Sequence, residues 1–307
     1  MSGSLALVHD QRPTVAIIAD DRFGMSRMQS AIEASGGNVT DALSIADIPE
    51  WLVKNCLVDT LVMEICEDSG ATLDRALDHI NQAVLRDSMA LILTIPHQLI
   101  DPIAARINAP WATILCDPTP TERIAALSLA WAEQNMRLND RGTDSDAVRL
   151  RDLALEVGRI ANALASVNDG RDLEGSHPAV HDVQLHYQVS PQYRTEFELK
   201  PAHIRALIKE RRQRERHCDL ELFADPAWDM MLDLMASRLE NVRVSVSSLC
   251  IAAAVPPTTA LRWIKTLTDL GHFVRIADPT DGRRVFIELS DMAASKLSLY
   301  FQDIHRN

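Results

Sequence analysis

The chain has 307 residues, 47% of them apolar, which is enough for two domains that each bury a core. Its formal net charge is −12, but residues 1–199 carry 15 Lys and Arg against 29 Asp and Glu, whereas residues 200–307 carry 16 against 14. The acidic excess predicts weaker nonspecific DNA affinity for the chain as a whole than a basic protein would show. It does not exclude DNA binding by the C-terminal part.

The five cysteines are scattered and include no Cys-x-x-Cys pair. We therefore expect neither disulfides nor a structural zinc site, as in a reducing cytosol. The first residues lack a basic end followed by a long apolar run, and no apolar stretch approaches the ~20 residues that span a bilayer. These features predict a soluble, cytoplasmic protein without membrane contact.

The N-terminal part, residues 1–136, alternates between strand and helix character, the pattern of a doubly wound five-stranded parallel sheet. The expected strands are Thr14–Ala19, Val39–Leu43, Asp59–Glu64, Met89–Thr94 and Trp111–Cys116. The expected helices are Met25–Ser35, Ile48–Asn55, Thr72–Leu85, Gln98–Ile107 and Thr121–Gln134. Strands that are apolar throughout fit an α/β sheet with helices on both faces.

Polar residues cluster where these strands end. Asp20 and Asp21 follow the first strand, and Thr94 ends the fourth. Five β/α units with an acidic pair at this place resemble the receiver domain of two-component response regulators. The resemblance implies that Asp20 and Asp21 stand at the family's magnesium site and Thr94 at its hydroxyl switch.

Two positions depart from the receiver pattern. Glu64 stands where the family has its phosphoacceptor aspartate, and Asp117, before Pro118, replaces the family's lysine. Without that lysine we expect no cation to hold a phosphoryl group, which Asp117 would repel. This predicts a pseudo-receiver that does not turn over phosphate. Weak Mg²⁺ binding, or acids that are merely solvated, remain alternatives, and this sheet edge could also take a small ligand or a regulatory protein.

Residues 144–168 read as a helical connector with an apolar heptad stripe. The positions that would form a coiled-coil dimer interface are Leu153, Val157, Ile160 and Leu164. The stripe is short, so a helix packed on its own domain is the alternative. Residues 169–200 then read as a linker, and we expect no metal site at its histidines, His177, His181 and His186.

Residues 201–307 form the predicted C-terminal domain. It begins with a basic helix at Pro201–His217. A solvated basic face is the default interpretation of this helix, and contact with phosphates, with acidic partners or with the DNA-binding domain of a dimer mate are the alternatives. Two apolar stripes are predicted to form its core. They are Trp228, Met231, Leu232, Met235 and Leu239, and Leu297, Tyr300, Phe301 and Ile304.

A helix-turn-helix is predicted within this domain. Val246–Ala254 is a short helix with Ser247 as its expected N-cap, and Val255-Pro256-Pro257 breaks the chain. The second helix, Thr258–Leu270, has an apolar stripe and ends at Gly271. Its opposite face offers donors and cations that suit a DNA major groove: Thr258, Thr259, Arg262, Lys265 and Thr266.

A hairpin follows the second helix. Phe273–Ile276 and Val285–Leu289 have strand character, and Asp281-Gly282 between them predicts a tight turn in which Gly282 takes a positive φ. Arg283 and Arg284 lie at the tip. Two helices followed by a basic-tipped hairpin give the order of a winged helix.

Residues from about Phe223 to Leu289 resemble the MarR-type winged-helix regulators. The resemblance is carried by Ser247-Ser-Leu-Cys-Ile-Ala, by Thr259, Arg262, Leu267 and Gly271, and by Asp278, Asp281 and Arg283, with Thr280 departing from the family's arginine. It implies a dimer bound to double-stranded DNA. Ser247 of the first helix would be one of the DNA-binding residues, and Arg283 or Arg284 would enter a minor groove.

The sequence thus predicts a DNA-binding transcriptional regulator with a receiver-like domain that works without phosphorylation. A signalling or scaffold protein that binds only proteins is the alternative. No Gly-rich phosphate loop, nucleophile elbow or paired catalytic acids indicate an enzyme, and no cofactor is expected.

Overall fold

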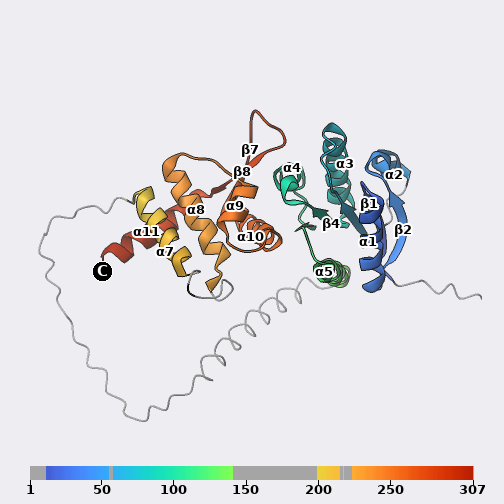
Figure 1. Cartoon of the computed structure of the whole chain (residues 1–307), viewed down its shortest axis with the longest axis horizontal. Helices are drawn as coiled ribbons and strands as arrows, with labels where there is room; N and C mark the ends of the chain where they lie inside the picture. Colours follow the sequence, from blue (N-terminus) through green and yellow to red (C-terminus); the bar gives the residue numbers. More distant parts are fainter. Residues whose placement is uncertain (1–11, 55–57, 141–198, 215–216, 218–222, 307) are drawn as a thin grey trace, which may run out of the picture. The chain divides into compact units, whose positions relative to one another are not determined.

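The structure is a computed structural model that describes residues 12–54, 58–140, 199–214, 217 and 223–306 (Figure 1). The predicted connector and its dimerisation positions, Leu153, Val157, Ile160 and Leu164, lie outside these residues. So do the three linker histidines. The chain divides into one compact unit, residues 1–132 with 197–307, and a second, residues 133–196. Among the described residues, none of the helices combines the length and apolarity that crossing a bilayer requires.

A five-stranded sheet forms the N-terminal domain. Its strands are β1 (Thr14–Ala19), β2 (Asn38–Leu43), β3 (Thr60–Glu64), β4 (Ala90–Ile95) and β5 (Ala112–Cys116). All neighbours pair in parallel, in the order β2-β1-β3-β4-β5. This is the flavodoxin-like doubly wound order, so the predicted receiver-like α/β fold is confirmed. Each predicted strand lies within one residue of its observed bounds.

Five helices connect and follow the strands. They are α1 (Arg22–Ala34), α2 (Ile48–Lys54), α3 (Ala71–Asp87), α4 (Ile100–Arg106) and α5 (Pro120–Asp140), with 3-10 turns η1 (Ile45–Asp47) and η2 (His97–Leu99). α4 begins later than predicted because Pro102 is tolerated only in a first turn. α5 runs beyond the predicted end at Gln134.

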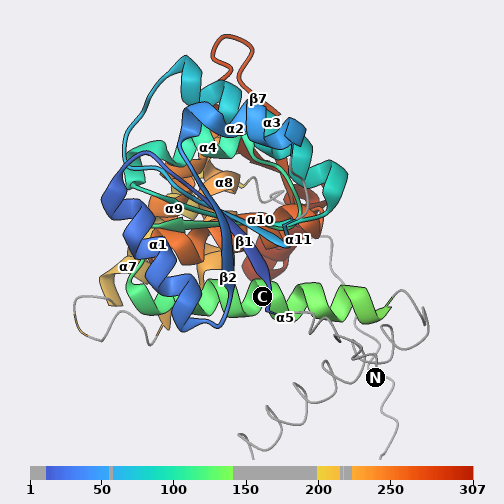
Figure 2. The ribbon, with the colours of Figure 1, turned by 90° about the vertical axis from the view of Figure 1, so that its right-hand side faces the viewer.

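Alternate side chains of each strand enter two separate cores. Val15, Ile17 and Val62 pack with residues of α1 and α5, whereas Ala16 and Ile18 pack on the side of α2, α3 and α4. Figure 2 shows α3 and α4 on one side of the strands and α5 on the other. This arrangement explains why the strands are apolar on both faces.

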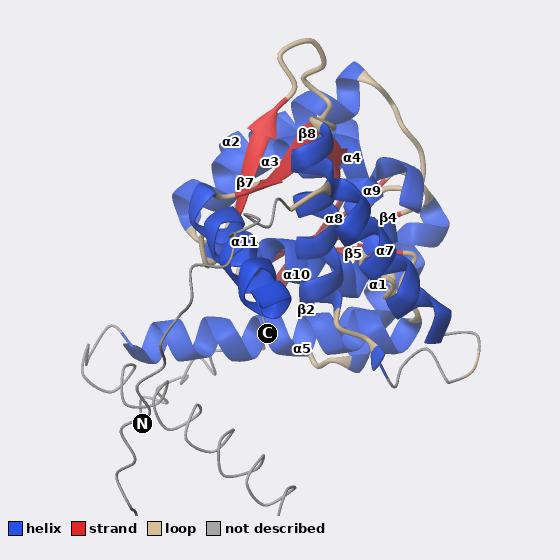
Figure 3. Ribbon diagram, turned by 90° about the vertical axis from the view of Figure 1, so that its left-hand side faces the viewer, coloured by secondary structure: helices blue, strands red, loops and turns tan. Residues whose placement is uncertain are grey.

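The C-terminal domain is helical with a small antiparallel sheet. Its elements are α7 (Pro201–Gln213), α8 (Pro226–Glu240), β6 (Val244–Ser245), α9 (Val246–Ala252), α10 (Pro257–Asp269), β7 (Phe273–Ala277), β8 (Val285–Leu289) and α11 (Asp291–Arg306). The strand order is β6-β8-β7, and a loop joins β7 to β8 (Figure 3). The two predicted helices and the hairpin are therefore present.

Local details of this domain correct the sequence analysis. The N-cap of α9 is Ser245, whose side chain accepts from the Ser248 N–H, so the prediction of Ser247 was wrong. The residue after the C-cap of α10 is Gly271, with φ +73°, as the helix end requires. Gly282 does not take the predicted positive φ, and the turn closes with a hydrogen bond from the Arg284 N–H to the Asp281 carbonyl.

The predicted apolar stripes are only partly core. Leu297 and Phe301 of α11 are buried, but Tyr300 and Ile304 are exposed, contrary to prediction. Tyr300 instead packs edge-on against Trp228 of α8. The stripe on α8 is buried at Leu232 and Met235, and partly buried at Trp228, Met231 and Leu239.

Candidate functional site

The side chain of Glu64 is the centre of the N-terminal candidate site. Glu64 is the last residue of β3 and is only 2% exposed. Its Oε1 accepts hydrogen bonds from Arg27 of α1, at 2.8 Å from Nε and 2.5 Å from Nη2. Arg123 of α5 places Nη2 at 3.5 Å from the same oxygen. Two guanidinium groups therefore converge on one buried carboxylate.

These contacts correct the expectation that no cation remains in the pocket. Arg27 and Arg123 come from helices on the same face of the sheet, and nothing in their spacing marks them as partners of Glu64. The one sequence sign is Gly24 in the first turn of α1. A Cβ there would lie 3.3 Å from Glu64 Cγ, so the glycine makes room for the longer carboxylate.

A cavity of about 200 Å³ opens beside Glu64. It is lined by Thr94, Asp117 and both arginines, among others, at the carboxyl ends of β3, β4 and β5. Buried Glu64 Oε2 and Thr94 Oγ1 have no hydrogen-bond partner within the described residues. Burial raises the pKa of Glu64, and Arg27 and Arg123 oppose the rise. The predicted pocket residues Glu64, Thr94 and Asp117 thus do come together.

The other two predicted pocket residues have structural partners. Asp20 Oδ2 accepts from the N–H groups of Cys66, at 2.6 Å, and Glu67, at 2.9 Å. Asp21 caps α1 by accepting from the Gly24 N–H. Ligand atoms of Asp20, Asp21 and Cys66 lie within 4.8 Å of one another.

Asp20, Asp21 and Cys66 are not an all-oxygen ligand set. Burial raises the pKa of the Cys66 thiol to about 12, so the sulfur keeps its proton at neutral pH. Magnesium prefers oxygen ligands. Glu64, the next carboxylate, shares Oε1 with Arg27 and Arg123, and its Oε2 is buried without a partner within the described residues.

The second candidate site is the polar face of α10 with the hairpin. Arg262 and Thr266 are exposed, and Lys265 is half-buried and paired with Asp269 at 2.7 Å. Thr259 is half-buried. On the opposite side, Ala260, Ile264 and Leu267 are buried, so the predicted amphipathic character of the helix is confirmed. Arg284 is exposed at the hairpin, 3.9 Å from Asp281.

Three predicted DNA-binding residues instead contact the receiver-like domain. Ser247 donates from its backbone N–H to Asp101 Oδ1 at 2.9 Å and from Oγ to Asp101 Oδ2 at 2.6 Å. Thr258 Oγ1 accepts from the Cys116 N–H at 2.9 Å and donates to the Cys116 carbonyl at 3.3 Å. The polar face of α10 is therefore occupied at Thr258, whereas its cation Arg262 stays exposed.

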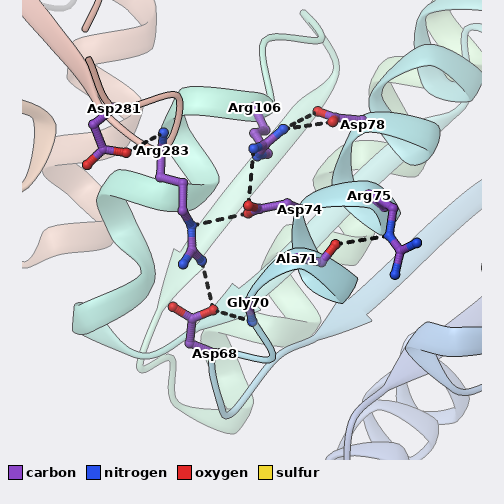
Figure 4. Close-up of polar contacts among 9 residues, drawn as sticks. All are labelled: Asp68, Gly70, Ala71, Asp74, Arg75, Asp78, Arg106, Asp281 and Arg283. Atoms are coloured by element: carbon purple, nitrogen blue, oxygen red, sulfur yellow. Dashed lines mark hydrogen bonds and ion pairs between the residues drawn. The ribbon is translucent and has the colours of Figure 1, made fainter.

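The third residue is Arg283, near the tip of the hairpin. Its Nη2 donates to Asp68 Oδ1 at 2.7 Å, and its Nε lies 3.2 Å from Asp74 Oδ1 (Figure 4). Asp74 also pairs with Arg106 at 3.2 Å. Arg283 holds the pKa of Asp68 below its usual range. Sequence reasoning missed these acidic partners because they are distant in the chain.

Apolar packing accompanies the polar contacts. α10 packs against β5, and α4 packs against α9 and β8. Buried residues of the sheet and of the C-terminal helices belong to one hydrophobic cluster. Arg275 of β7 is partly buried and donates to the Ala104 carbonyl of α4. The receiver-like domain thus covers part of the predicted DNA-binding surface.

No family model matches the chain, and no curated protein matches it. One similar solved structure is the signal receiver domain of an HD domain-containing protein from Pseudomonas fluorescens, at 21% identity and TM-score 0.33 over 41% of this chain and 99% of that one. RcsB from Salmonella enterica serovar Typhimurium bound to promoter rprA has 15% identity and TM-score 0.30, over 42% and 66%.

The heme sensor protein PefR from Streptococcus agalactiae, in complex with heme, has 16% identity and TM-score 0.23 over 36% of this chain and 78% of that one. Such TM-scores are too low for these likenesses to add to what the chain's own geometry shows.

Proposed function

We propose that the chain is a DNA-binding transcriptional regulator. Residues 201–307 would form a MarR-like winged helix that binds double-stranded DNA as a cytoplasmic homodimer. The observation that carries this proposal is the polar face of α10, which presents exposed Arg262 and Thr266 opposite a buried apolar stripe. α10 contacts β7 of the hairpin, which adds exposed Arg284. A helix and hairpin of this kind can contact base edges and phosphates together.

The receiver-like domain is proposed to work without phosphorylation. The buried carboxylate of Glu64 already binds Arg27 and lies near Arg123, so its charge is compensated within the protein. An added phosphoryl group would have to displace these partners and would meet Asp117 in the same cavity. We therefore propose that the domain needs neither metal nor phosphodonor to hold its structure.

A signalling or scaffold protein is the second candidate. The contacts that Ser247, Thr258 and Arg283 make within the protein favour it, because groups expected on DNA are occupied there. The two candidates differ in one measurable property. Only the regulator binds duplex DNA through α10 and the hairpin.

The test begins with genome-wide mapping of the sites that the protein occupies, followed by affinity measurements of the full chain on the recovered duplex. Arg262→Ala should weaken specific binding by about 1–3 kcal/mol if it contacts a base edge. Lys296→Ala is the matched control, since it removes an exposed cation from α11 of the same domain. Equal affinities of the two variants, or no occupied sites, would favour the scaffold protein.

A further inference from the structure

The polar contacts that Arg283 and Ser247 make with the receiver-like domain share one chemical pattern. On the C-terminal side, the groups are a guanidinium, a hydroxyl and a backbone N–H, from Arg283 and Ser247. On the receiver-like side, each of these groups meets a carboxylate. Arginine, hydroxyl and backbone N–H donors are also the groups with which proteins contact DNA phosphates. A carboxylate and a phosphate therefore compete for the same donors.

The carboxylates come from two places in the receiver-like domain. Asp68 lies in the loop before α3 and Asp74 lies in the first turn of α3, and together they hold Arg283 (Figure 4). Asp101 lies in the first turn of α4 and holds Ser247 through both of its oxygens. Two separate donors of the proposed DNA-binding surface are thus occupied by acids.

The side chains at these contacts are partly shielded from water. Arg283 is 30% exposed, Asp68 40% and Asp74 18%. The carboxylate of Asp74 forms ion pairs with both Arg283 and Arg106. The acids come from the half of the chain that carries the acidic excess, and the donors come from the half that does not.

We propose that the receiver-like domain inhibits DNA binding by using Asp68, Asp74 and Asp101 as substitutes for DNA phosphates. This inference rests on the proposed function. In this arrangement a DNA duplex cannot contact Arg283 and Ser247 until their bonds to the receiver-like domain break. DNA binding and the contact between the domains are then mutually exclusive, and a signal acts by shifting the balance between them.

The expected size of the effect follows from the contacts. Neutral amides in place of the three acids remove the ionic part of the contact but leave the apolar packing of α10 on β5. The fraction of molecules competent to bind DNA sets the apparent affinity. We expect Asp68→Asn, Asp74→Asn and Asp101→Asn together to raise the affinity of the full chain for duplex DNA about tenfold, from two weak ion pairs and the hydrogen bonds to the charged Asp101.

The experiment compares the wild type, this triple variant and a charge-matched control. The control carries Glu33→Gln, Asp41→Asn and Glu50→Gln, which remove three charges from the receiver-like domain away from the contact. Affinity is measured on mixed-sequence duplex DNA, because phosphate contacts do not depend on sequence. Hydrogen exchange is followed at the amides of Ser247 and Cys116, which bond Asp101 and Thr258 across the contact.

The proposal expects the triple variant to bind about tenfold more tightly than both other proteins, with faster exchange at both amides. Saturating DNA should also speed exchange at these amides in the wild type. Equal affinities of triple variant and control, or amides that stay protected in the DNA complex, would overturn it. If the amides open in the triple variant and no protein binds DNA, the proposed function fails. If they stay protected and nothing binds, the acids do not hold the domains and the inference fails.

Discussion

The ion pair between Arg27 and Glu64 supports the sharpest stability prediction. Arg27→Met removes two hydrogen bonds to a carboxylate that is 3% exposed. Hydrogen bonds to charged groups contribute about 1.5–3 kcal/mol when buried. The arginine side chain is 44% exposed and Arg123 remains near the carboxylate, so we discount the sum. The expected loss in the free energy of unfolding at pH 7 is about 2 kcal/mol.

Removing the charge of the carboxylate instead of the arginine should lower the free energy of unfolding by less. Glu64→Gln leaves Arg27 without its carboxylate, but that side chain reaches solvent and water replaces the lost partner. We expect a loss of about 1 kcal/mol, and Arg27→Met should then cost under about 0.5 kcal/mol in the Glu64→Gln background. Urea unfolding followed by tryptophan fluorescence measures all four proteins.

The cost of Arg27→Met should also depend on pH. Burial raises the pKa of Glu64, and loss of Arg27 raises it further. The folded variant then binds a proton more tightly than the unfolded chain does, so it regains stability as the pH falls through the folded pKa. The difference from the wild type should be smaller at pH 5 than at pH 7. An equal loss at both values, or an equal loss in the Glu64→Gln background, would refute the assignment of this pair.

Three further predictions test a buried hydrogen bond, a close packing contact and a helix cap. Trp131→Phe should cost about 1–2 kcal/mol in urea unfolding, because Trp131 Nε1 donates to buried Thr60 Oγ1 at 3.0 Å, and adding Thr60→Val should recover part of the loss. Gly37→Ala should lower the free energy of unfolding by about 1–3 kcal/mol, since the new Cβ would lie 2.7 Å from Trp131 Cη2. Gly282→Ala is the control, because its Cβ would meet open space and the change should be near neutral. Asp225→Ala should cost about 1 kcal/mol in thermal unfolding, because Asp225 accepts from the Trp228 N–H as the N-cap of α8; no loss would contradict that role.

Local signals sufficed for most of the secondary structure. Apolar runs between glycines and prolines gave the strands and helices to within a few residues, since hydrophobic periodicity and turn chemistry act over short distances. The end of α10 at Gly271 shows this, with the His272 N–H bonding the Leu267 carbonyl and the Gly271 N–H bonding the Thr268 carbonyl.

The contacts that define the candidate sites could not be predicted in this way. Glu64 with Arg27, and Asp68 with Arg283, join residues that are distant in sequence, and no periodicity specifies such pairs. The departure at Glu64 was visible in the sequence, but its partner was not. A glutamate in place of the expected aspartate indicated a changed pocket, and only the packing of α1 and α5 shows which cations compensate its charge.

The position of β5 at the margin of the sheet has a further consequence. Its outer backbone groups would face water as an unpaired strand, yet the Thr258 hydroxyl bonds both the N–H and the carbonyl of Cys116. Bare strand margins invite pairing with other chains and aggregation. Any rearrangement that takes α10 away leaves this margin unprotected. Because the Thr258 hydroxyl covers this edge, release of α10 is expected to increase the tendency of the protein to aggregate.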